Sequence, residues 1–378
     1  MTDPGCDAMI CAVRAQLEQI SASGYKSFRD LNLLLAPINV LVGANGSGKS
    51  SFLSLFKMFS QMMKGELQLH IAQAGGADYI LHYGRKVTKE LVLRLRIALD
   101  EGALPIRYTC RLVPAADLLL IAGESVRFGS GEAPISAGEL SPESRLPRWA
   151  EADRWVRRLY QVLSAWRVYH FHDTSAGARV KQMGDIHQNE ALLEDAGNLA
   201  AHLYLLREKH PGHYRTIVET IQMAAPFFGD FVLRPHPLNP EKIRLEWRER
   251  NSDLTFGPGA LSDGMLRFIC LAALLLQPVE LLPSLIILDE PELGLHPFAI
   301  RLLAAMVRAA AHDAQVILAT QSVTLVNQFA PEDVLVVERA EGASTIRRLD
   351  DAALAGWLED YGLGDLWDKS VFGGHPTR

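Results

Sequence analysis

Gly43-Ala44-Asn45-Gly46-Ser47-Gly48-Lys49-Ser50 is the stretch that decides the fold of this chain. It reads glycine, four residues, Gly-Lys and then serine, which is the pattern of a loop that wraps phosphate groups. Glycines let backbone N–H groups turn toward a phosphate where a side chain would block the approach. The apolar run 38–42 before the loop predicts a buried strand, and the residues from Ser51 onward predict an amphipathic helix. We therefore expect a nucleoside triphosphate at the N-terminus of that helix.

The residues of this loop have separate expected roles. Lys49 is expected to reach the β- and γ-phosphates, and the Ser50 hydroxyl to ligate Mg²⁺. The alternative is a glycine-rich turn without a ligand, which the flanking strand and helix disfavour. The nucleotide contacts are assigned to Gly43, Ala44, Asn45, Gly46, Ser47, Gly48, Lys49, Ser50 and Ser51.

A second acidic site follows the apolar run 285–288, which ends in Asp289 and Glu290. Such a run predicts a buried parallel strand, and its acidic end should lie at the carboxyl edge of the sheet, where ligands bind in α/β folds. We expect Asp289 to hold Mg²⁺ through its water shell, and Glu290 to orient or deprotonate the attacking water. A strand end with solvated acids is the alternative, and the phosphate loop makes it less favoured.

Between these two sites lies Leu261-Ser262-Asp263-Gly264-Met265, followed by an apolar helix over 266–276. With the motifs on either side, this order resembles the RecF/SMC-type branch of the ABC ATPases. The chain is also similar to a bacterial group of stand-alone predicted AAA-family ATPases, related to the overcoming-lysogenization-defect type without its nuclease domain. The resemblance covers nearly the whole chain, and the segment 292–297 resembles the D-loop of the family.

The resemblance implies how the signature works. In the family, the positions of Leu261, Ser262, Asp263 and Gly264 form the motif that contacts the γ-phosphate held by the opposite subunit. It therefore implies a head-to-tail homodimer, or a higher multiple, around ATP and Mg²⁺. At the strand end after 316–319 the family usually places a histidine, whereas this chain has Gln321. Gln321 can donate a hydrogen bond to phosphate or position water but cannot take up a proton, so we expect slow or partner-dependent turnover; alternatively it is only a polar strand-end residue.

Composition limits the remaining classes of protein. The 378 residues are 48% hydrophobic, enough for a bilobal molecule, and the net charge of −6 gives no global basic field that attracts nucleic acid. Four scattered cysteines, Cys6, Cys11, Cys110 and Cys270, lack metal-ligand spacing and suit a reducing cytosol. The N-terminus lacks the basic residues of a signal peptide, and the apolar stretch 268–288 is interrupted by prolines and polar residues. We expect a cytoplasmic protein with no membrane partner.

These patterns predict an α/β fold of the P-loop NTPase class: a bilobal, ABC/SMC-head-like mixed sheet with an antiparallel β-subdomain and a helical lobe. Lobe I should span 9–175, and lobe II 176–378 with a C-terminal helix. The alternating runs 91–99, 106–113 and 118–128 predict an antiparallel meander. Helical periodicity predicts helices over 151–166, 190–207 and 214–224, and a short hairpin is expected from 231–234 and 243–248. The sequence contains no heptad run that extends over several turns, so we expect no long coiled-coil arm.

Three further groups of residues have more than one reading. His170 and His172 alternate on a strand and could ligate zinc, or His172 and Asp173 could sense the nucleotide, although simple packing is favoured. The arginines between 145 and 158, close to Trp149 and Trp155, fit either a phosphate-backbone contact or a solvated helix face. Lys26 either approaches the nucleotide or lies on the plain surface.

The function favoured by the sequence is an ATP-hydrolysing switch that dimerises around ATP and acts on DNA or on an effector protein, in DNA repair or antiviral defence. One alternative is the ATPase subunit of a nuclease complex whose nuclease lies on another chain, because only about fifty residues follow Gln321. Another is a transporter ATPase, which the absence of glutamine at Met265 disfavours.

Overall fold

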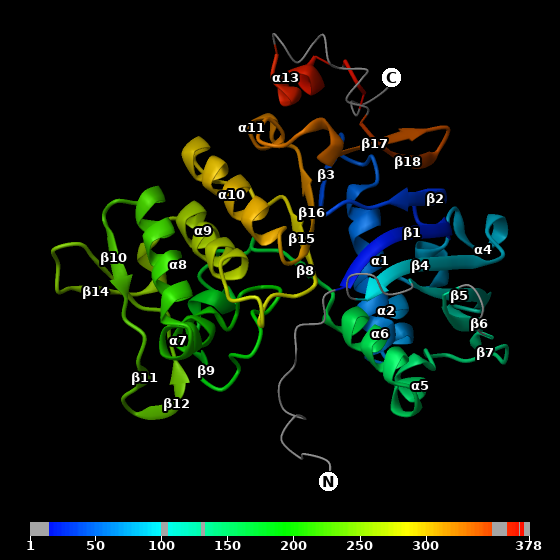
Figure 1. Ribbon diagram of the computed structural model, residues 1–378, viewed down its shortest axis with the longest axis horizontal. Coiled ribbons are helices and arrows are strands. Elements are labelled where there is room, and N and C mark those ends of the chain that lie inside the picture. Colours follow the sequence, from blue (N-terminus) through cyan, green and yellow to red (C-terminus); the bar gives the residue numbers. More distant parts are fainter. Residues whose placement is uncertain (1–14, 100–104, 130–132, 350–360, 370, 374–378) are drawn as a thin grey trace.

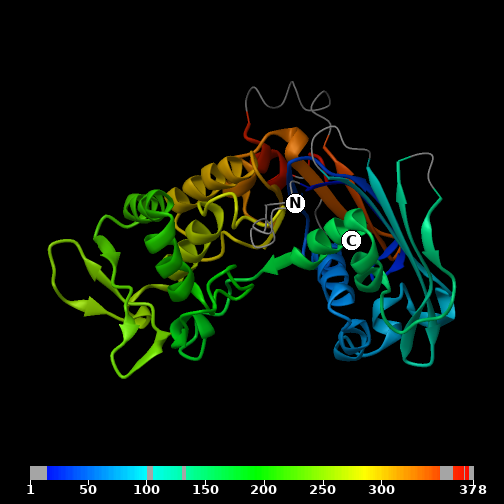
Figure 2. The ribbon, with the colours of Figure 1, turned by 60° about the horizontal axis from the view of Figure 1, so that its bottom comes forward.

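The computed structural model describes residues 15–99, 105–129, 133–349, 361–369 and 371–373, and its elements are labelled in Figure 1. Two six-stranded sheets form its frame. Figure 2 shows two lobes side by side, with the blue and cyan N-terminal segments in one and the yellow-green segments around residues 200–260 in the other. The expectations for Cys6 and Cys11 fall outside the described residues, and the helix nearest the C-terminus among the described residues is α13 (Leu363–Asp368).

The first sheet is antiparallel and forms the outer wall of lobe I. Its strand order is β2-β1-β4-β5-β6-β7. Because apolar and polar residues alternate along the strands, one face is buried and the other meets solvent. The predicted meander is confirmed, and the bounds are β1 Ala15–Tyr25, β2 Phe28–Leu34, β4 Leu91–Leu99, β5 Ile106–Ala115, β6 Leu118–Phe128 and β7 Ile135–Ala137.

The second sheet is mixed and carries the phosphate-loop strand near its centre. Its order is β18-β17-β3-β16-β15-β8, in which all neighbours pair parallel except the antiparallel hairpin of β17 and β18. The bounds are β3 Ile38–Val42, β8 Arg167–Tyr169, β15 Leu285–Asp289, β16 Gln315–Thr320, β17 Val334–Ala340 and β18 Ala343–Arg348. Strands β15 and β16 are nearly all buried, as expected for runs covered on both faces.

One hydrophobic cluster fills the space between the two sheets. Phe52, Phe56 and Phe59 of α1 (Lys49–Met63) pack there against the buried face of the antiparallel sheet. Trp166 lies edge-on to Phe56 and Phe59. This cluster holds the phosphate-loop helix between the sheets. The other helices of lobe I are α2 Leu67–Gln73, α3 Ala77–Ile80, α4 Gly84–Val87, α5 Leu146–Ala152 and α6 Arg154–Ala165.

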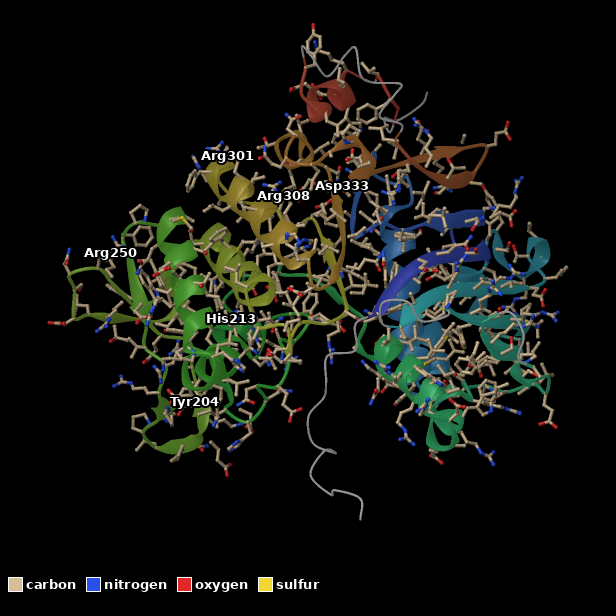
Figure 3. All side chains as sticks on the ribbon, in the orientation of Figure 1. Tyr204, His213, Arg250, Arg301, Arg308 and Asp333 are labelled. Carbon is tan, nitrogen blue, oxygen red and sulfur yellow. The ribbon has the colours of Figure 1, made fainter. Side chains whose placement is uncertain are left out.

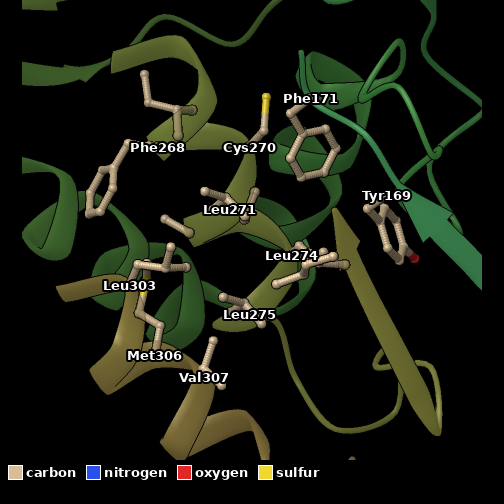
Figure 4. Packing of buried hydrophobic residues seen from close by; sticks show 14 of the residues in the cluster. Tyr169, Phe171, Phe268, Cys270, Leu271, Leu274, Leu275, Leu303, Met306 and Val307 are labelled. Carbon is tan, nitrogen blue, oxygen red and sulfur yellow. The ribbon is translucent and has the colours of Figure 1, made fainter. Parts of the chain in front are cut away.

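The second hydrophobic cluster forms the core of the helical lobe. Figure 4 shows Leu271, Leu274 and Leu275 of α9 packed against Leu303 and Val307 of α10. The helices are α7 Leu199–Lys209, α8 Pro211–Ala224, α9 Asp263–Leu275, α10 Pro297–Ala310 and α11 Val323–Val326, with 3₁₀ turns at Arg179–Lys181, Pro258–Ala260 and Pro331–Asp333. The small strands are β9 Gly184–Asp185, β10 Phe228–Phe231, β11 Pro235–His236, β12 Asn239–Ile243, β13 Trp247–Glu249 and β14 Thr255–Phe256.

Three of the expected elements differ in detail. Residues 190–198 are not helical, because buried Asn198 accepts from Leu193 N–H and donates to the carbonyls of Gln188 and Ala191, which folds the segment into turns. The helix expected over 151–166 is divided at Asp153, whose side chain caps α6. The expected hairpin is instead two pairs, β10 with β13 and β11 with β12.

Within the described residues, no helix combines the length and apolar character needed to cross a bilayer. The two-lobed arrangement with one mixed and one antiparallel sheet confirms the predicted fold class. The division between residues 175 and 176 stays a prediction.

Candidate functional site

The carboxyl ends of three neighbouring parallel strands meet at one edge of the mixed sheet. Strand β16 pairs with β3 on one side and with β15 on the other. The loop 43–50 follows β3, Glu290 follows β15, and Gln321 follows β16. The fold thereby brings together residues that are almost 280 positions apart in the sequence. We call this region, with Asp289 and Glu292, the carboxyl edge.

The shape of the loop 43–50 depends on its glycines, either because a side chain would clash or because the backbone has a positive φ. A Cβ on Gly43 would lie 2.4 Å from the carbonyl oxygen of Val337, so only glycine lets the loop approach β17. Gly46 and Gly48 have φ of +77° and +122°, a region that side chains disfavour. A Cβ on Gly46 would meet nothing within 4 Å, so this part of the loop is open to a ligand.

Lys49 is buried within this loop, with 7% of its surface exposed. Its Nζ donates to the carbonyls of Gly43 and Ala44. Burial lowers the pKa of Lys49, and the negative charges of Glu290, Asp289 and Glu292 oppose that shift. The ammonium group is thus held against the loop and within electrostatic reach of the acidic residues of the carboxyl edge, and its positive charge would favour a phosphate bound in the loop.

Two serines of the loop fit the groups that ATP and Mg²⁺ would present. The buried Ser47 Oγ has no hydrogen-bond partner among the described residues, although the Ser47 carbonyl accepts from Ser344 Oγ at 2.5 Å. An unpaired buried hydroxyl carries a cost that a ligand oxygen would remove. Ser50 is exposed in the first turn of α1. Hydroxyl and carboxylate oxygens are the ligands that Mg²⁺ prefers, so Ser50 and Asp289 suit the metal.

Glu290 adopts an unusual backbone conformation directly after β15. Its φ is +43°, in the left-handed region, where non-glycine residues are uncommon. Its N–H donates to the Ala319 carbonyl at 2.8 Å, and its side-chain Oε1 accepts a hydrogen bond from Gln321 Nε2. Backbone strain of this kind persists where the surrounding structure enforces it, often at functional sites. The predicted base and the predicted switch residue are therefore in direct contact.

Glu292 is the third carboxylate at the edge, and sequence reasoning did not predict its contacts. Its Oε1 accepts from Thr320 Oγ1 at 2.5 Å and from Gln321 N–H at 3.2 Å. Burial raises the pKa of Glu292, and the charge of Glu290 adds to that effect. Glu292 therefore fixes the end of β16, and with it the position of Gln321.

His170 and His172 lie beside Asp289. His170 Nδ1 lies 3.5 Å from Asp289 Oδ2, and His172 Nε2 is 3.0 Å from the Asp289 carbonyl oxygen. Burial lowers the pKa of His170 and raises the pKa of Asp289. No group of three metal-ligating side chains occurs among the described residues, so the zinc reading gains no support. Their position fits the nucleotide-sensing reading.

The predicted signature lies in the helical lobe. Ser262 caps α9, where its Oγ accepts from Met265 N–H at 3.3 Å, and Leu261 is buried. Asp263 lies 3.9 Å from Lys181 Nζ. A Cβ on Gly264 would lie 2.2 Å from the Gly294 carbonyl oxygen, so the signature packs against the segment resembling a D-loop.

Arg267 joins three segments that sequence reasoning did not connect. Its guanidinium donates to the carbonyls of Phe171, His172 and Leu293, at 3.1, 2.8 and 3.0 Å. It thereby links α9 to the histidine segment and to the residues that follow Glu290. The signal in the sequence is a single arginine inside the apolar run 266–276. The chain thus gathers the predicted loop, acids and Gln321 at one edge, while the signature belongs to the other lobe.

Comparison with known proteins places this site in a family. A family model described as "AAA domain, putative AbiEii toxin, Type IV TA system" matches residues 38–91 and 143–327, more than half of the chain. The match includes the phosphate loop, the signature, Asp289, Glu290 and Gln321. No curated protein matches the chain.

Solved structures share the fold at low sequence identity. The Smc head bound to the C-winged helix domain of ScpA has a TM-score of 0.59 and 15% identity, and the alignment covers 88% of this chain and 98% of that one. The Smc head domain with an extended coiled coil from Pyrococcus furiosus, bound to the C-terminal domain of ScpA, has a TM-score of 0.57 and 16% identity, with coverages of 92% and 99%. The Smc head domain with a coiled coil and joint from Pyrococcus yayanosii has a TM-score of 0.53 and 12% identity, again with coverages of 92% and 99%. At this identity the likeness shows an SMC-head-like fold.

Proposed function

The chain belongs to the family of AAA domains described above, and on that premise we propose that it binds ATP with Mg²⁺ at the carboxyl edge and hydrolyses it. The observation that carries the proposal is the meeting of Lys49, Glu290 and Gln321 at adjacent strand ends. Lys49 supplies positive charge to the phosphates, and the loop supplies N–H groups. Mg²⁺, held by Ser50 and through its water shell by Asp289, would neutralise charge on the β- and γ-phosphates.

Glu290 is proposed as the group that orients the attacking water and takes its proton. Its contact with Gln321 Nε2 gives Gln321 a definite part, because the amide holds the Glu290 carboxylate in one orientation. An amide cannot accept the proton itself. We therefore infer that Gln321 is a positioning residue and that turnover is slow, since proton transfer depends on Glu290 alone.

We also propose that two copies close around two ATP molecules. Helix α9 packs with α7, α8 and α10 of the helical lobe, whereas the phosphate loop packs against β17 and β18. A signature carried by the opposite lobe suits contact with the γ-phosphate of a second copy, and such an interface closes on two-fold symmetry. Hydrolysis would then release the two copies.

The target of this switch is proposed to be DNA or an effector protein. The description of the family mentions a toxin of a type IV toxin–antitoxin system, which fits control of an effector in antiviral defence. The Smc heads with a similar fold were solved with a partner protein bound, which fits a protein target. If the target is DNA, we propose that the switch acts in DNA repair.

Three variants test the proposal. Glu290→Gln should bind ATP normally and lose turnover by about 10²-fold or more, because general-base catalysis contributes about 10²- to 10⁴-fold. Lys49→Ala should abolish tight ATP binding. Phosphate release and binding of a fluorescent ATP analogue measure the two effects separately. Hydrolysis by Glu290→Gln at the wild-type rate would contradict the proposal that Glu290 accepts the proton of the attacking water.

The same Glu290→Gln variant tests assembly. Addition of ATP should shift its mass in light scattering toward the dimer, and Ser262→Arg in that background should block the shift while ATP still binds. A mass that does not change with ATP in Glu290→Gln would contradict an ATP-dependent dimer.

A further inference from the structure

The solvent-facing side of the antiparallel sheet carries arginines arranged by strand register. Strand β4 alternates buried leucine or isoleucine with exposed residues, so Arg94 and Arg96 point outward. The same alternation turns Arg107 and Arg111 of β5 and Arg127 of β6 to that side. We call this surface the arginine face. Its strands are cyan to teal at the right edge of Figure 2.

Register places three of these charges in one row. Arg96 of β4 lies opposite Arg107 of β5, and Arg107 lies opposite Arg127 of β6. Side chains directly opposite on neighbouring strands have Cβ atoms about 4.5–5.5 Å apart, and like charges in that position destabilise the sheet. Arginine remains charged at every physiological pH, so this repulsion persists.

Only part of this charge is neutralised within the sheet. Arg96 Nε lies 2.6 Å from Glu18 Oε2, and Arg111 Nη2 lies 2.7 Å from Glu90 Oε1. Arg94, Arg107 and Arg127 have no hydrogen bond or ion pair to any residue in the described ranges. Because such a row of like charges destabilises the sheet, it indicates that these arginines serve to bind a ligand outside the sheet.

We propose that the arginine face binds the phosphate backbone of duplex DNA. Residues two apart on a strand are about 6.8 Å apart and neighbouring strands about 4.8 Å apart, so the guanidinium groups can engage several phosphates at once. The planar guanidinium binds phosphate through two parallel hydrogen bonds. A net charge of −6 for the whole chain makes this concentration of positive charge local to one face.

The outward side chains favour duplex over single-stranded nucleic acid. The outward positions of β1, β4, β5 and β6 hold arginine, serine, threonine, glutamine, the ion-paired Glu18 and small or aliphatic residues, and none is aromatic. Proteins that bind single strands stack bases on aromatic side chains, which this face lacks. The antiparallel sheet that carries this face has six strands and is about 24 Å wide, broader than the roughly 12 Å major groove. The duplex would therefore lie across the face, and binding would not depend on sequence.

This inference rests on the DNA branch of the proposed function and on neither hydrolysis nor dimerisation. The test uses the nucleotide-free protein and a fluorescent 30-base-pair duplex at salt concentrations from 50 to 200 mM. The variant Arg94→Gln/Arg107→Gln/Arg127→Gln should bind at least tenfold more weakly at low salt. Its slope of log affinity against log salt should fall by about 2.7, since each phosphate contact contributes about 0.9.

A matched variant controls for the change in net charge. Arg215→Gln/Arg250→Gln/Arg301→Gln removes the same charge from the helical lobe, where Figure 3 shows Arg250 and Arg301 far from the sheet. We expect the control to keep the wild-type salt slope. Thermal unfolding checks the fold, and the arginine-face variant should melt no lower than wild type because repelling pairs are removed.

Each remaining outcome overturns a definite part of the inference. If wild type and the arginine-face variant bind the duplex with equal affinity and equal salt slope, the arginine face is not the binding surface, and the DNA must bind elsewhere on the protein. A wild-type protein that does not bind the duplex at 50 mM salt would end the DNA branch, while ATP hydrolysis is judged separately by Glu290→Gln. Tighter binding of a 30-nucleotide single strand than of the duplex would overturn the choice of duplex.

Discussion

The carboxyl edge and the arginine face differ in how their charges are partnered. At the edge, Lys49 lies near three carboxylates, and Glu290 and Glu292 both accept hydrogen bonds from the Thr320–Gln321 strand end. On the face, Arg107 and Arg127 lie opposite each other without an ion pair to a described residue, and they continue a row from Arg96, which pairs with Glu18. Charges with partners fix a geometry that chemistry requires, whereas charges without partners remain available to a ligand. Substitutions should therefore destabilise the edge and its supports, and stabilise the face.

The largest expected loss comes from the packing behind the edge. Gly264→Ala would place a Cβ 2.2 Å from the Gly294 carbonyl oxygen, a backbone atom that cannot rotate away. We expect a loss of about 3 kcal/mol in the free energy of unfolding, the upper range for overpacking. Urea denaturation measures it. Gly259→Ala is the matched control, because a Cβ there would meet nothing within 4 Å, and it should change stability by less than about 0.5 kcal/mol. Equal losses in the two variants would contradict this packing.

The next effect concerns the arginine that connects the edge to its neighbours. Arg267→Met keeps the length of the side chain but leaves the carbonyls of Phe171, His172 and Leu293 without their donor. Hydrogen bonds to a charged group contribute about 1.5–3 kcal/mol, and partial exposure reduces that, so we expect a loss of about 2 kcal/mol. The substitution Arg301→Met, at an exposed position, should lower the free energy of unfolding much less. A melting temperature for Arg267→Met no lower than for Arg301→Met would show that this connection contributes little.

Sequence patterns predicted the parts of the molecule that depend on local signals. The strand–loop–helix around Lys49 and the meander 91–128 follow from spacing and alternation within short windows, and both are present. The contacts of Arg267 could not be predicted, because its three acceptors lie about 95 and 26 residues away. The row of arginines depends on strand register, which alternation alone does not determine. The non-helical segment before α7 depends on one buried side chain, Asn198.

A pH effect separates the two regions further. Burial raises the pKa of Glu292 in the folded protein, so the native state binds more protons than the unfolded chain above the ordinary glutamate pKa of about 4.5. Stability from this group therefore falls as pH rises through that range. Glu292→Gln keeps the acceptor oxygen and removes the titration. The melting temperature of the variant relative to that of wild type should therefore increase as pH rises from about 4.5 to 7. A constant difference across that range would contradict the raised pKa.

The smallest effect tests the face by itself and has the opposite sign to the first two. Arg107 lies between Arg96 and Arg127, so Arg107→Gln removes two repelling cross-strand pairs. Each such pair changes stability by roughly 0.2–1 kcal/mol, and we expect a net gain of about 0.5 kcal/mol in denaturant unfolding. Arg111→Gln is the matched comparison on the same strand, because it breaks the ion pair with Glu90 and should give no gain. The gain should shrink at high salt, where screening weakens the repulsion in wild type. If Arg107→Gln destabilises the protein at low salt, the arginine row is held by partners, and the contrast between edge and face is lost.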